Sequence, residues 1–272
     1  MEPLFANYNE PRDRIRGLAD SACPLRAVFL EGGEHYGKSY LLACLKPELV
    51  PPAHMVIVDL DKRRSVPTPI EILTQVGESL GWRYFPNLEA EVERELQRKR
   101  SINATVSNVT ITGSYNKVEA NAQENEGDRL LAAIWVTRGF LDDLRALPVE
   151  LRPLILAFDG YAPSMSLIDG WFDRSLVSGL CEIDHVRLIV CGREVPQTTV
   201  KARTAPARAI EVPLTGVTEL DDWLPIVAAL KRRIPGEAAS EQSGFMRGVI
   251  RAHRGAPGLI MREIRLFDAS EA

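Results

Sequence analysis

Short apolar runs alternate along the chain with longer segments in which apolar residues recur at helical spacing. Within the runs, successive positions are apolar, which is typical of strands in a parallel sheet that helices cover on both faces. Right-handed crossovers between such strands build a three-layer α/β domain. The predicted strands are residues 27–30, 55–59, 154–158, 186–190 and 210–214.

Helical patterns fill the intervals between several of these runs. In residues 70–80, for example, apolar residues recur every three or four positions, which predicts one buried helix face. After the last strand the pattern is helical. We therefore expect an α/β domain at residues 1–215 and a small C-terminal helical lobe at residues 216–272. The predicted helices are residues 38–44, 70–80, 130–147, 219–231, 244–253 and 257–267, and the charged run at residues 91–100 is interpreted as the solvated face of a further helix.

One segment, residues 101–127, breaks this alternation because it is rich in Asn, Ser and Thr. Apolar residues alternate with polar ones around Val106, Val109 and Ile111, and residues 113–116 have the composition of a turn. We interpret the segment as an inserted β-hairpin with an open edge for pairing with another chain or element. A mobile surface loop is the alternative interpretation.

The most specific motif is Gly-Gly-Glu-His-Tyr-Gly-Lys-Ser at residues 32–39, which matches G-x-x-x-x-G-K-[ST] at every fixed position. It follows an apolar strand and opens a helix, which is the context that phosphate binding requires. The glycines let backbone N–H groups face a β-phosphate, and the helix N-terminus adds partial positive charge. Lys38 would contact the β- and γ-phosphates, and the Ser39 hydroxyl would coordinate Mg²⁺. The predicted nucleotide-binding residues here are Gly32, Gly33, Glu34, His35, Tyr36, Gly37, Lys38, Ser39 and Tyr40.

A magnesium site of this kind needs a carboxylate at a neighbouring strand end. Asp159 ends the third apolar run and is the candidate Mg²⁺ ligand; a cap on the following turn is its alternative role. An ATPase that activates water normally has another acid close behind this carboxylate. Here Gly160 follows, and the nearest later acid is Asp169. The general base is therefore absent from its expected place.

The fourth apolar run ends in Cys-Gly-Arg, so that Arg193 stands at a second strand end. A guanidinium beside the phosphate loop can sense or stabilise the charge of a γ-phosphate. A surface ion pair with Glu194 is the alternative role for this arginine.

In their order along the chain, these pieces resemble the STAND branch of the AAA+ P-loop NTPases, which includes NACHT and NB-ARC domains. The phosphate loop and its strand look like Walker A, and LILAFDG at residues 154–160 looks like Walker B. LIVCGRE at residues 188–194 is similar to the strand that ends in the sensor 1 arginine. HRGAPGLIMREI at residues 253–264 resembles the G-x-P motif. The resemblance covers nearly the whole chain.

This resemblance implies that ATP or ADP binds with Mg²⁺ between the α/β domain and the helical lobe. Pro257 would pack near the adenine, and Phe5 or Tyr8 would approach the base. The missing acid after Asp159 implies weak or absent hydrolysis. Such modules act as regulatory switches that an effector or sensor protein, or a homo-oligomer, completes. Bacterial relatives frequently act in signalling and antiviral defence.

The composition is ordinary for a soluble globular protein, with 45% hydrophobic and 26% charged residues. A net charge of −4 and a pI of about 5.7 argue against a nucleic-acid-binding surface. The four cysteines form no CxxC pair, no signal peptide is visible, and no apolar run approaches the ~18 residues of a membrane span. We therefore expect a cytoplasmic protein without membrane contact.

Three functions are compatible with these patterns. The first is a nucleotide-gated switch with slow or absent hydrolysis. The second is an active Mg²⁺-dependent ATPase whose base comes from Glu34, His35 or a neighbouring subunit. The third is a nucleotide-free protein-interaction module that uses the insertion. A DNA-loading ATPase would share the predicted fold but fits poorly with the acidic composition.

Overall fold

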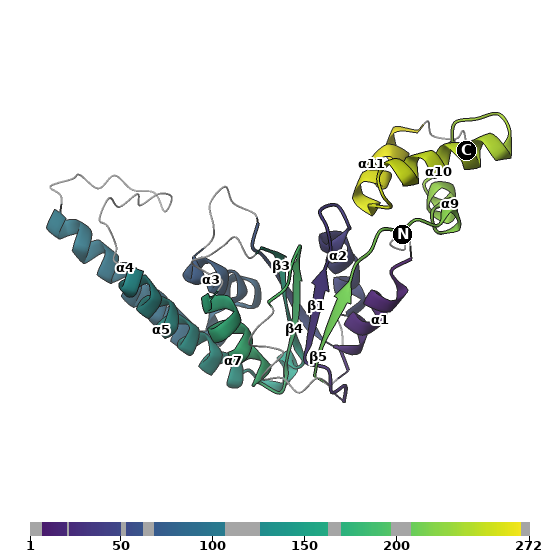
Figure 1. Ribbon diagram of the computed structural model, residues 1–272. Coiled ribbons are helices and arrows are strands. Elements are labelled where there is room, and N and C mark those ends of the chain that lie inside the picture. The colour runs from purple at the N-terminus through teal and green to yellow at the C-terminus, as the bar shows by residue number, and fades with distance from the viewer. Residues whose placement is uncertain are drawn as a thin grey trace.

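The computed structural model describes residues 7–20, 22–49, 53–61, 68–106, 126–162, 170–196 and 208–267. Within this part of the chain, parallel strands form a five-stranded sheet in the order β2-β3-β4-β1-β5 (Figure 1). The predicted three-layer α/β fold with a parallel sheet is confirmed. The strands are β1 (Ala27–Glu31), β2 (His54–Asp59), β3 (Leu154–Tyr161), β4 (Val186–Gly192) and β5 (Ala209–Pro213).

Every predicted helix is present, although several begin or end a few residues from their predicted limits. The first helix and the helical segment between β3 and β4 were not predicted. None of the described helices combines the length and the apolar content needed to cross a bilayer. The helices are α1 (Asn9–Gly17), α2 (Lys38–Leu49), α3 (Pro69–Leu80), α4 (Pro86–Val106), α5 (Glu126–Arg145), the π-helical η3 (Phe172–Val177), α7 (Ser178–Cys181), α9 (Leu220–Ala229), α10 (Ala239–Ala252) and α11 (Pro257–Leu266).

Side chains of the strands alternate between two hydrophobic cores. In β1, Ala27 and Phe29 belong to the core that α3, α4, α5 and α7 cover. Val28 and Leu30 belong to the core that α1 and α2 cover. Because both faces are buried, successive strand positions are apolar, and this accounts for the uninterrupted runs in the sequence.

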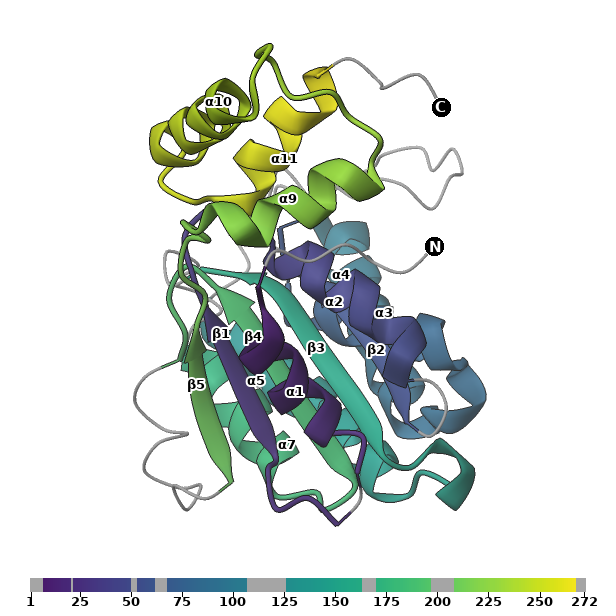
Figure 2. The same cartoon turned by 90° about the vertical axis from the view of Figure 1, so that its right-hand side faces the viewer.

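The C-terminal lobe, α9 to α11, shares its core with the α1–α2 face of the sheet. Trp223, Ile250 and Ile260, one from each helix, belong to the same buried cluster as Leu30 and Leu41. Figure 2 shows the lobe beyond the end of the sheet at which β1 leads into α2. The lobe therefore packs next to the phosphate loop.

On the opposite side, α4 and α5 lie side by side and extend away from the sheet (Figure 1). Residues 101–106, which we assigned to the inserted hairpin, continue α4, so that the predicted start of the insertion is wrong. An existing helix gains one hydrogen bond for each residue added, and this overcomes a polar local composition. Residues 107–125, the rest of the predicted hairpin up to α5, lie outside the described residues.

The start of α4 is held by Asp143, a buried carboxylate of α5. Asp143 Oδ1 accepts hydrogen bonds from the backbone N–H of Asn87 at 3.2 Å and from its side-chain Nδ2 at 2.7 Å. Asp143 Oδ2 accepts one from the backbone N–H of Leu88 at 2.8 Å. These N–H groups have no partner inside their own helix, and a negative charge also complements the helix dipole. One side chain therefore fixes the register of the α4–α5 pair.

We expect Asp143→Ala to lower the free energy of unfolding by roughly 2 kcal/mol, because buried N–H donors lose a charged acceptor. The neighbouring Asp142→Ala is the control, since Asp142 makes a half-exposed ion pair with Arg145 at 2.8 Å, and such pairs contribute about 0.3–0.5 kcal/mol. Urea denaturation measures both variants. Equal losses in the two variants would contradict the capping role.

Candidate functional site

The predicted phosphate loop connects β1 to α2 at the carboxyl end of the sheet, and backbone hydrogen bonds hold its start from two sides. The N–H of Gly32 donates to the carbonyl of Gly192, at the end of β4, over 3.1 Å. On the other side, the N–H of Leu214, just after β5, donates to Glu31 O over 2.6 Å. The loop therefore leaves the sheet in a fixed direction.

The end of the loop leaves backbone donors available. The first hydrogen bond of α2 runs from Leu41 N–H to Gly37 O, at 2.8 Å. The N–H groups of residues 37–39 precede it and have no backbone carbonyl acceptor among the described residues. Such donors at a helix N-terminus, together with the helix dipole, form a binding site for an anion.

Two loop glycines are required by geometry. A Cβ on Gly33 would overlap the ring of Tyr36, and Gly37 has a φ of +78°. His35 also has a positive φ, of 66°, which is uncommon outside glycine although His adopts it more readily than most residues. The loop therefore has a specific, partly strained shape rather than that of an ordinary turn.

Lys38 folds back over the loop. Its Nζ donates to the carbonyls of Gly32, at 2.6 Å, and Gly33, at 2.7 Å. Burial lowers the pKa of this ammonium, although the negative charge of Asp159 acts in the opposite direction. A partly desolvated cation that is bonded only to neutral carbonyls is stabilised when an anion approaches it.

Ser39 and Asp159 meet beside the loop, because the Ser39 hydroxyl donates a hydrogen bond to the Asp159 carboxylate. Burial raises the pKa of Asp159, while the bond from Ser39 acts to lower it. In the sheet register, Asp159 lies opposite Cys191 of β4 and Asp59 of β2. The two predicted Mg²⁺ ligands are therefore adjacent, and a second carboxylate stands on the neighbouring strand.

Arg193, just after β4, reaches the same loop. Its Nη2 donates to Glu34 Oε2 at 2.7 Å, and the positive charge of Arg193 contributes to the lowered pKa of Lys38. The alternative role for this arginine is an ion pair with Glu194; in the structure its partner is the loop residue Glu34. The two side chains are 67% and 62% exposed, so that the pair contributes at most about 1 kcal/mol.

Tyr8 joins the loop to the segment that leads into the lobe. Its buried hydroxyl donates to Tyr36 O at 2.8 Å and lies 3.3 Å from Thr215 O. Burial raises the pKa of this phenol well above its ordinary value, so that it stays a hydrogen-bond donor at physiological pH. Phe5, the other aromatic candidate, lies outside the described residues.

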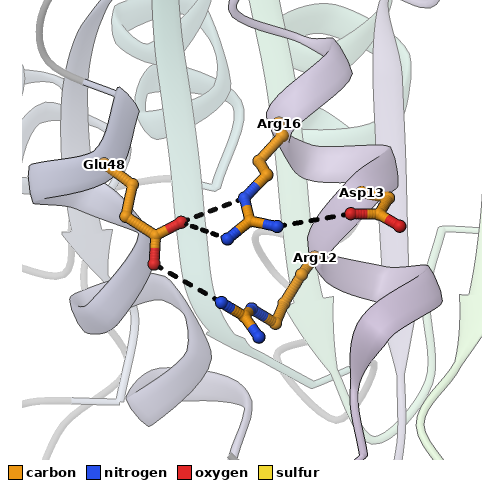
Figure 3. A network of polar contacts seen from close by, with 4 residues as sticks. All are labelled: Arg12, Asp13, Arg16 and Glu48. Carbon is orange, nitrogen blue, oxygen red and sulfur yellow. Dashed lines mark hydrogen bonds and ion pairs between the residues drawn. The ribbon is translucent and has the colours of Figure 1, made fainter. Parts of the chain in front are cut away.

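An ion-pair network fixes the helix that follows Tyr8 (Figure 3). Glu48 of α2 accepts hydrogen bonds from Arg16 Nε at 3.0 Å and Nη2 at 2.7 Å, and it lies 3.7 Å from Arg12 Nη2. Asp13 accepts a further bond from Arg16, at 3.3 Å. The network attaches α1 to α2, the helix that continues the phosphate loop, and so places Tyr8 against the loop.

The lobe contacts the loop directly. The N–H of Gly258, in the first turn of α11, donates to His35 O at 2.7 Å. Pro257 Cβ lies 4.0 Å from where a Cβ on Gly37 would stand. The structure therefore brings the G-x-P segment, which lies more than 200 residues along the chain, against the phosphate loop.

These residues suit a nucleotide phosphate. The loop offers backbone donors and the Lys38 ammonium, and Ser39 with Asp159 offers two oxygens to Mg²⁺. In the described part of the chain, no trio of His, Cys, Asp and Glu side chains is arranged as a metal site. Ser39 and Asp159 would hold the ion together with the nucleotide phosphates, which is a common arrangement for Mg²⁺.

The structure thus brings together Lys38, Ser39, Asp159, Arg193 and Pro257. Glu34, His35 and Tyr40 are exposed at the surface of the loop and of α2. Sequence reasoning missed two further acids at this edge of the sheet. They are Asp59, which ends β2, and Asp61, whose backbone N–H donates to Asp59 Oδ1 at 2.9 Å. The signal that could have found Asp59 is its position at the end of a predicted parallel strand.

No protein family matches the sequence, and no curated protein does. Among solved structures, a chain of Drosophila ORC bound to DNA is 11% identical, with a TM-score of 0.40, over 78% of this chain and 95% of that one. A chain from Drosophila ORC bound to AT-rich DNA and Cdc6 is 10% identical, with a TM-score of 0.36, over 89% and 69% of the two chains. C. elegans PCH-2 is 11% identical, with a TM-score of 0.37, over 86% of this chain and 50% of that one. These are AAA+ proteins with a parallel sheet. With TM-scores below 0.5, the similarity is limited to the α/β fold.

We expect Tyr8→Phe to lower the free energy of unfolding by about 1 kcal/mol, since Tyr36 O loses a donor in a buried position. The ring stays in place, so that the packing around it is retained. Thermal and urea denaturation measure the change. An unchanged stability would show that the hydroxyl does not hold the loop to the connector.

Proposed function

We propose that this protein is a nucleotide-gated switch, in which ATP or ADP with Mg²⁺ binds at the phosphate loop and the helical lobe responds to it. The observation that carries the proposal is the hydrogen bond from Gly258 N–H to His35 O. Any change in the backbone of the loop acts directly on the first turn of α11. This contact would therefore couple nucleotide binding directly to the position of the lobe.

Different residues of the chain would contact the phosphates and the Mg²⁺ ion. Backbone N–H groups of residues 37–39 and the Lys38 ammonium would hold the β- and γ-phosphates. Ser39 and Asp159 would hold Mg²⁺, which when bound neutralises phosphate charge. Arg193 would exchange its exposed pair with Glu34 for the γ-phosphate, because a charge-assisted bond to phosphate is the stronger of the two.

Two further contacts would carry the loop's state toward the lobe. Tyr8 links Tyr36 O to Thr215 O in the connector. The N–H of Val217 donates to Gly255 O at 2.8 Å, so that the connector is bonded to the segment before α11. Loop, connector and α11 are thus linked in a ring by backbone hydrogen bonds and the Tyr8 hydroxyl. A ligand with different affinities for two lobe positions would shift their populations.

The choice of ATP or ADP over GTP, and a place among the STAND switches, follow from the resemblance of the motifs. On the same ground we propose that an effector or sensor protein, or a second copy of the chain, responds to the lobe in bacterial signalling or antiviral defence. Hydrolysis is expected to be slow, because Gly160 follows the Asp159 carboxylate where a second acid is usual.

A nucleotide-free interaction module is the competing function, and one observation favours it. α5 exposes four large apolar side chains near its start, an unusual feature for a solvated helix. These side chains are Leu130, Leu131, Ile134 and Trp135. The thermal shift described next separates the two functions.

At 100 times the dissociation constant, Mg-ATP or Mg-ADP should stabilise the protein by about 2.7 kcal/mol, which raises Tm by about 5–10 °C. Lys38→Ala should remove most of this shift by weakening phosphate binding. Lys46→Ala is the matched control, because Lys46 is an exposed lysine of the same helix. The absence of a shift in the wild type, or an equal shift in Lys38→Ala, would contradict nucleotide binding at the loop.

The switch itself predicts that the lobe moves. Spin-label amino acids placed at Glu78 of α3 and Arg247 of α10, both exposed, report the distance between the sheet and the lobe. We expect different distance distributions with ADP and with a non-hydrolysable ATP analogue, measured by pulsed electron paramagnetic resonance. Identical distributions with both nucleotides bound would refute the switch while leaving nucleotide binding intact.

A further inference from the structure

The position after Asp159 has an unusual backbone, and a neighbouring strand occupies the space beside it. Gly160 has a φ of +84°, a conformation that other residues adopt only with strain. A Cβ built on Gly160 would lie 2.8 Å from Asp61 Cβ and 3.2 Å from Asp61 N. The side chain of Asp61 therefore begins beside Gly160, so close that a side chain at position 160 would clash with it.

Asp61 is positioned by Asp59. The backbone N–H of Asp61 donates to Asp59 Oδ1 at 2.9 Å, and the N–H of Leu60 between them donates to Asp159 O at 2.8 Å. The bond from Leu60 attaches the end of β2 to the end of β3, and the bond to Asp59 holds the turn that carries Asp61, so that Asp61 keeps its place beside Gly160. The carboxylate of Asp61 is exposed and can reach a solvent molecule.

The same edge of the sheet faces the phosphate loop. Asp59 and Asp159 are register partners, and the charge of Asp59 acts on Asp159. Asp159 in turn is bonded to Ser39 and interacts with Lys38. Asp59, at the end of β2, and Asp61, just after it, are thus linked to the proposed phosphate site through the carboxylate of Asp159.

We propose that Asp61 replaces the acid missing after Asp159 and acts as the general base for ATP hydrolysis, with Asp59 as its positioning residue. The inference rests on the proposed nucleotide site and adds a reaction to it. A carboxylate at the position of a Walker B acid can accept a proton from a water molecule that attacks the γ-phosphate. The slow turnover of the switch then comes from this chain alone, without a residue from a neighbouring subunit.

In the proposed step, water and ATP give ADP and phosphate. The water oxygen forms a bond to the γ-phosphorus as the bond from that phosphorus to the β–γ bridging oxygen breaks. The electron pair of the broken bond stays on the bridging oxygen of ADP. One water proton passes to the Asp61 carboxylate and then to solvent, which restores the base.

The loop residues are weaker candidates for this role. Glu34 is paired with Arg193 at 2.7 Å and lies 3.7 Å from His35 Nε2, so that its carboxylate already has partners. The carbonyl of His35 is bonded to the lobe and its φ is already strained. Neither residue stands beside the Walker B strand.

The test compares Asp61→Asn with the wild type and with Glu78→Gln, a control at an exposed acid of α3. Phosphate release with Mg²⁺ should fall by about 100-fold or more in Asp61→Asn, which is the usual effect of losing a general base. The dissociation constant for ATP should stay within about threefold, because the interaction is made in the transition state. The nucleotide extracted after incubation with ATP should be ATP from Asp61→Asn and ADP from the wild type.

The role of Asp59 has its own test. Asp59→Ala should slow turnover, whereas Asp59→Asn should restore it, since the amide oxygen still accepts the N–H of Asp61. An ATP dissociation constant that stays constant across both variants would separate positioning from a loss of fold.

Each remaining outcome is decisive. Turnover in Asp61→Asn equal to that of the wild type would overturn the inference and place the base elsewhere. A wild type that binds ATP without any turnover would also overturn it, but would leave the proposed switch standing. A wild type that binds neither ATP nor ADP would remove both proposals, so that the two failures are distinguishable.

Discussion

A single backbone hydrogen bond, from Gly258 to the carbonyl of His35, determines how the two parts of this molecule depend on each other. The carbonyl that accepts it belongs to a residue with φ of 66°, a conformation that persists where surrounding contacts stabilise it. The lobe therefore contacts the loop at the residue whose backbone is strained. In the same way, α11 starts where it does because the loop offers that carbonyl.

The parallel sheet supplies the other half of the site through its register. Residues two apart on a strand face the same side, and Asp159 shares its face with Ile155 and Ala157 of the core under α2. Asp59, the register partner of Asp159, lies on the same face of the sheet as Met55, which belongs to the same core. The ends of β2 and β3 thus present carboxylates on the face where α2 begins. Strand periodicity, rather than any local motif, decides which polar side chains meet the loop.

The sequence predicted those features that are local or periodic. The strands, most helices, the phosphate loop and the Ser39–Asp159 pair followed from apolar runs and a motif of eight residues. The contacts of Tyr8 and Gly258 did not, because they join segments about 30 and more than 200 residues from the loop and involve backbone atoms, which leave no pattern in side chains. Asp61 was missed because what marks it is its close approach to Gly160. That approach arises only when β2 and β3 pair in the folded sheet.

The electrostatics of the loop explain why an anion would reorganise it. Lys38 is partly desolvated and bonded to neutral carbonyls, and Asp159 carries a raised pKa because burial opposes its charge. A polyphosphate with a bound divalent cation would place an anion beside the Lys38 ammonium and a cation beside the Asp159 carboxylate. It would thus offset the desolvation penalty of both charged groups. Arg193 is held only by an exposed pair with Glu34, which contributes at most about 1 kcal/mol, so that a γ-phosphate can recruit it. Under the proposed function, the end of β4 would respond to the third phosphate and Gly258 to the loop as a whole, and these separate contacts would distinguish ATP from ADP.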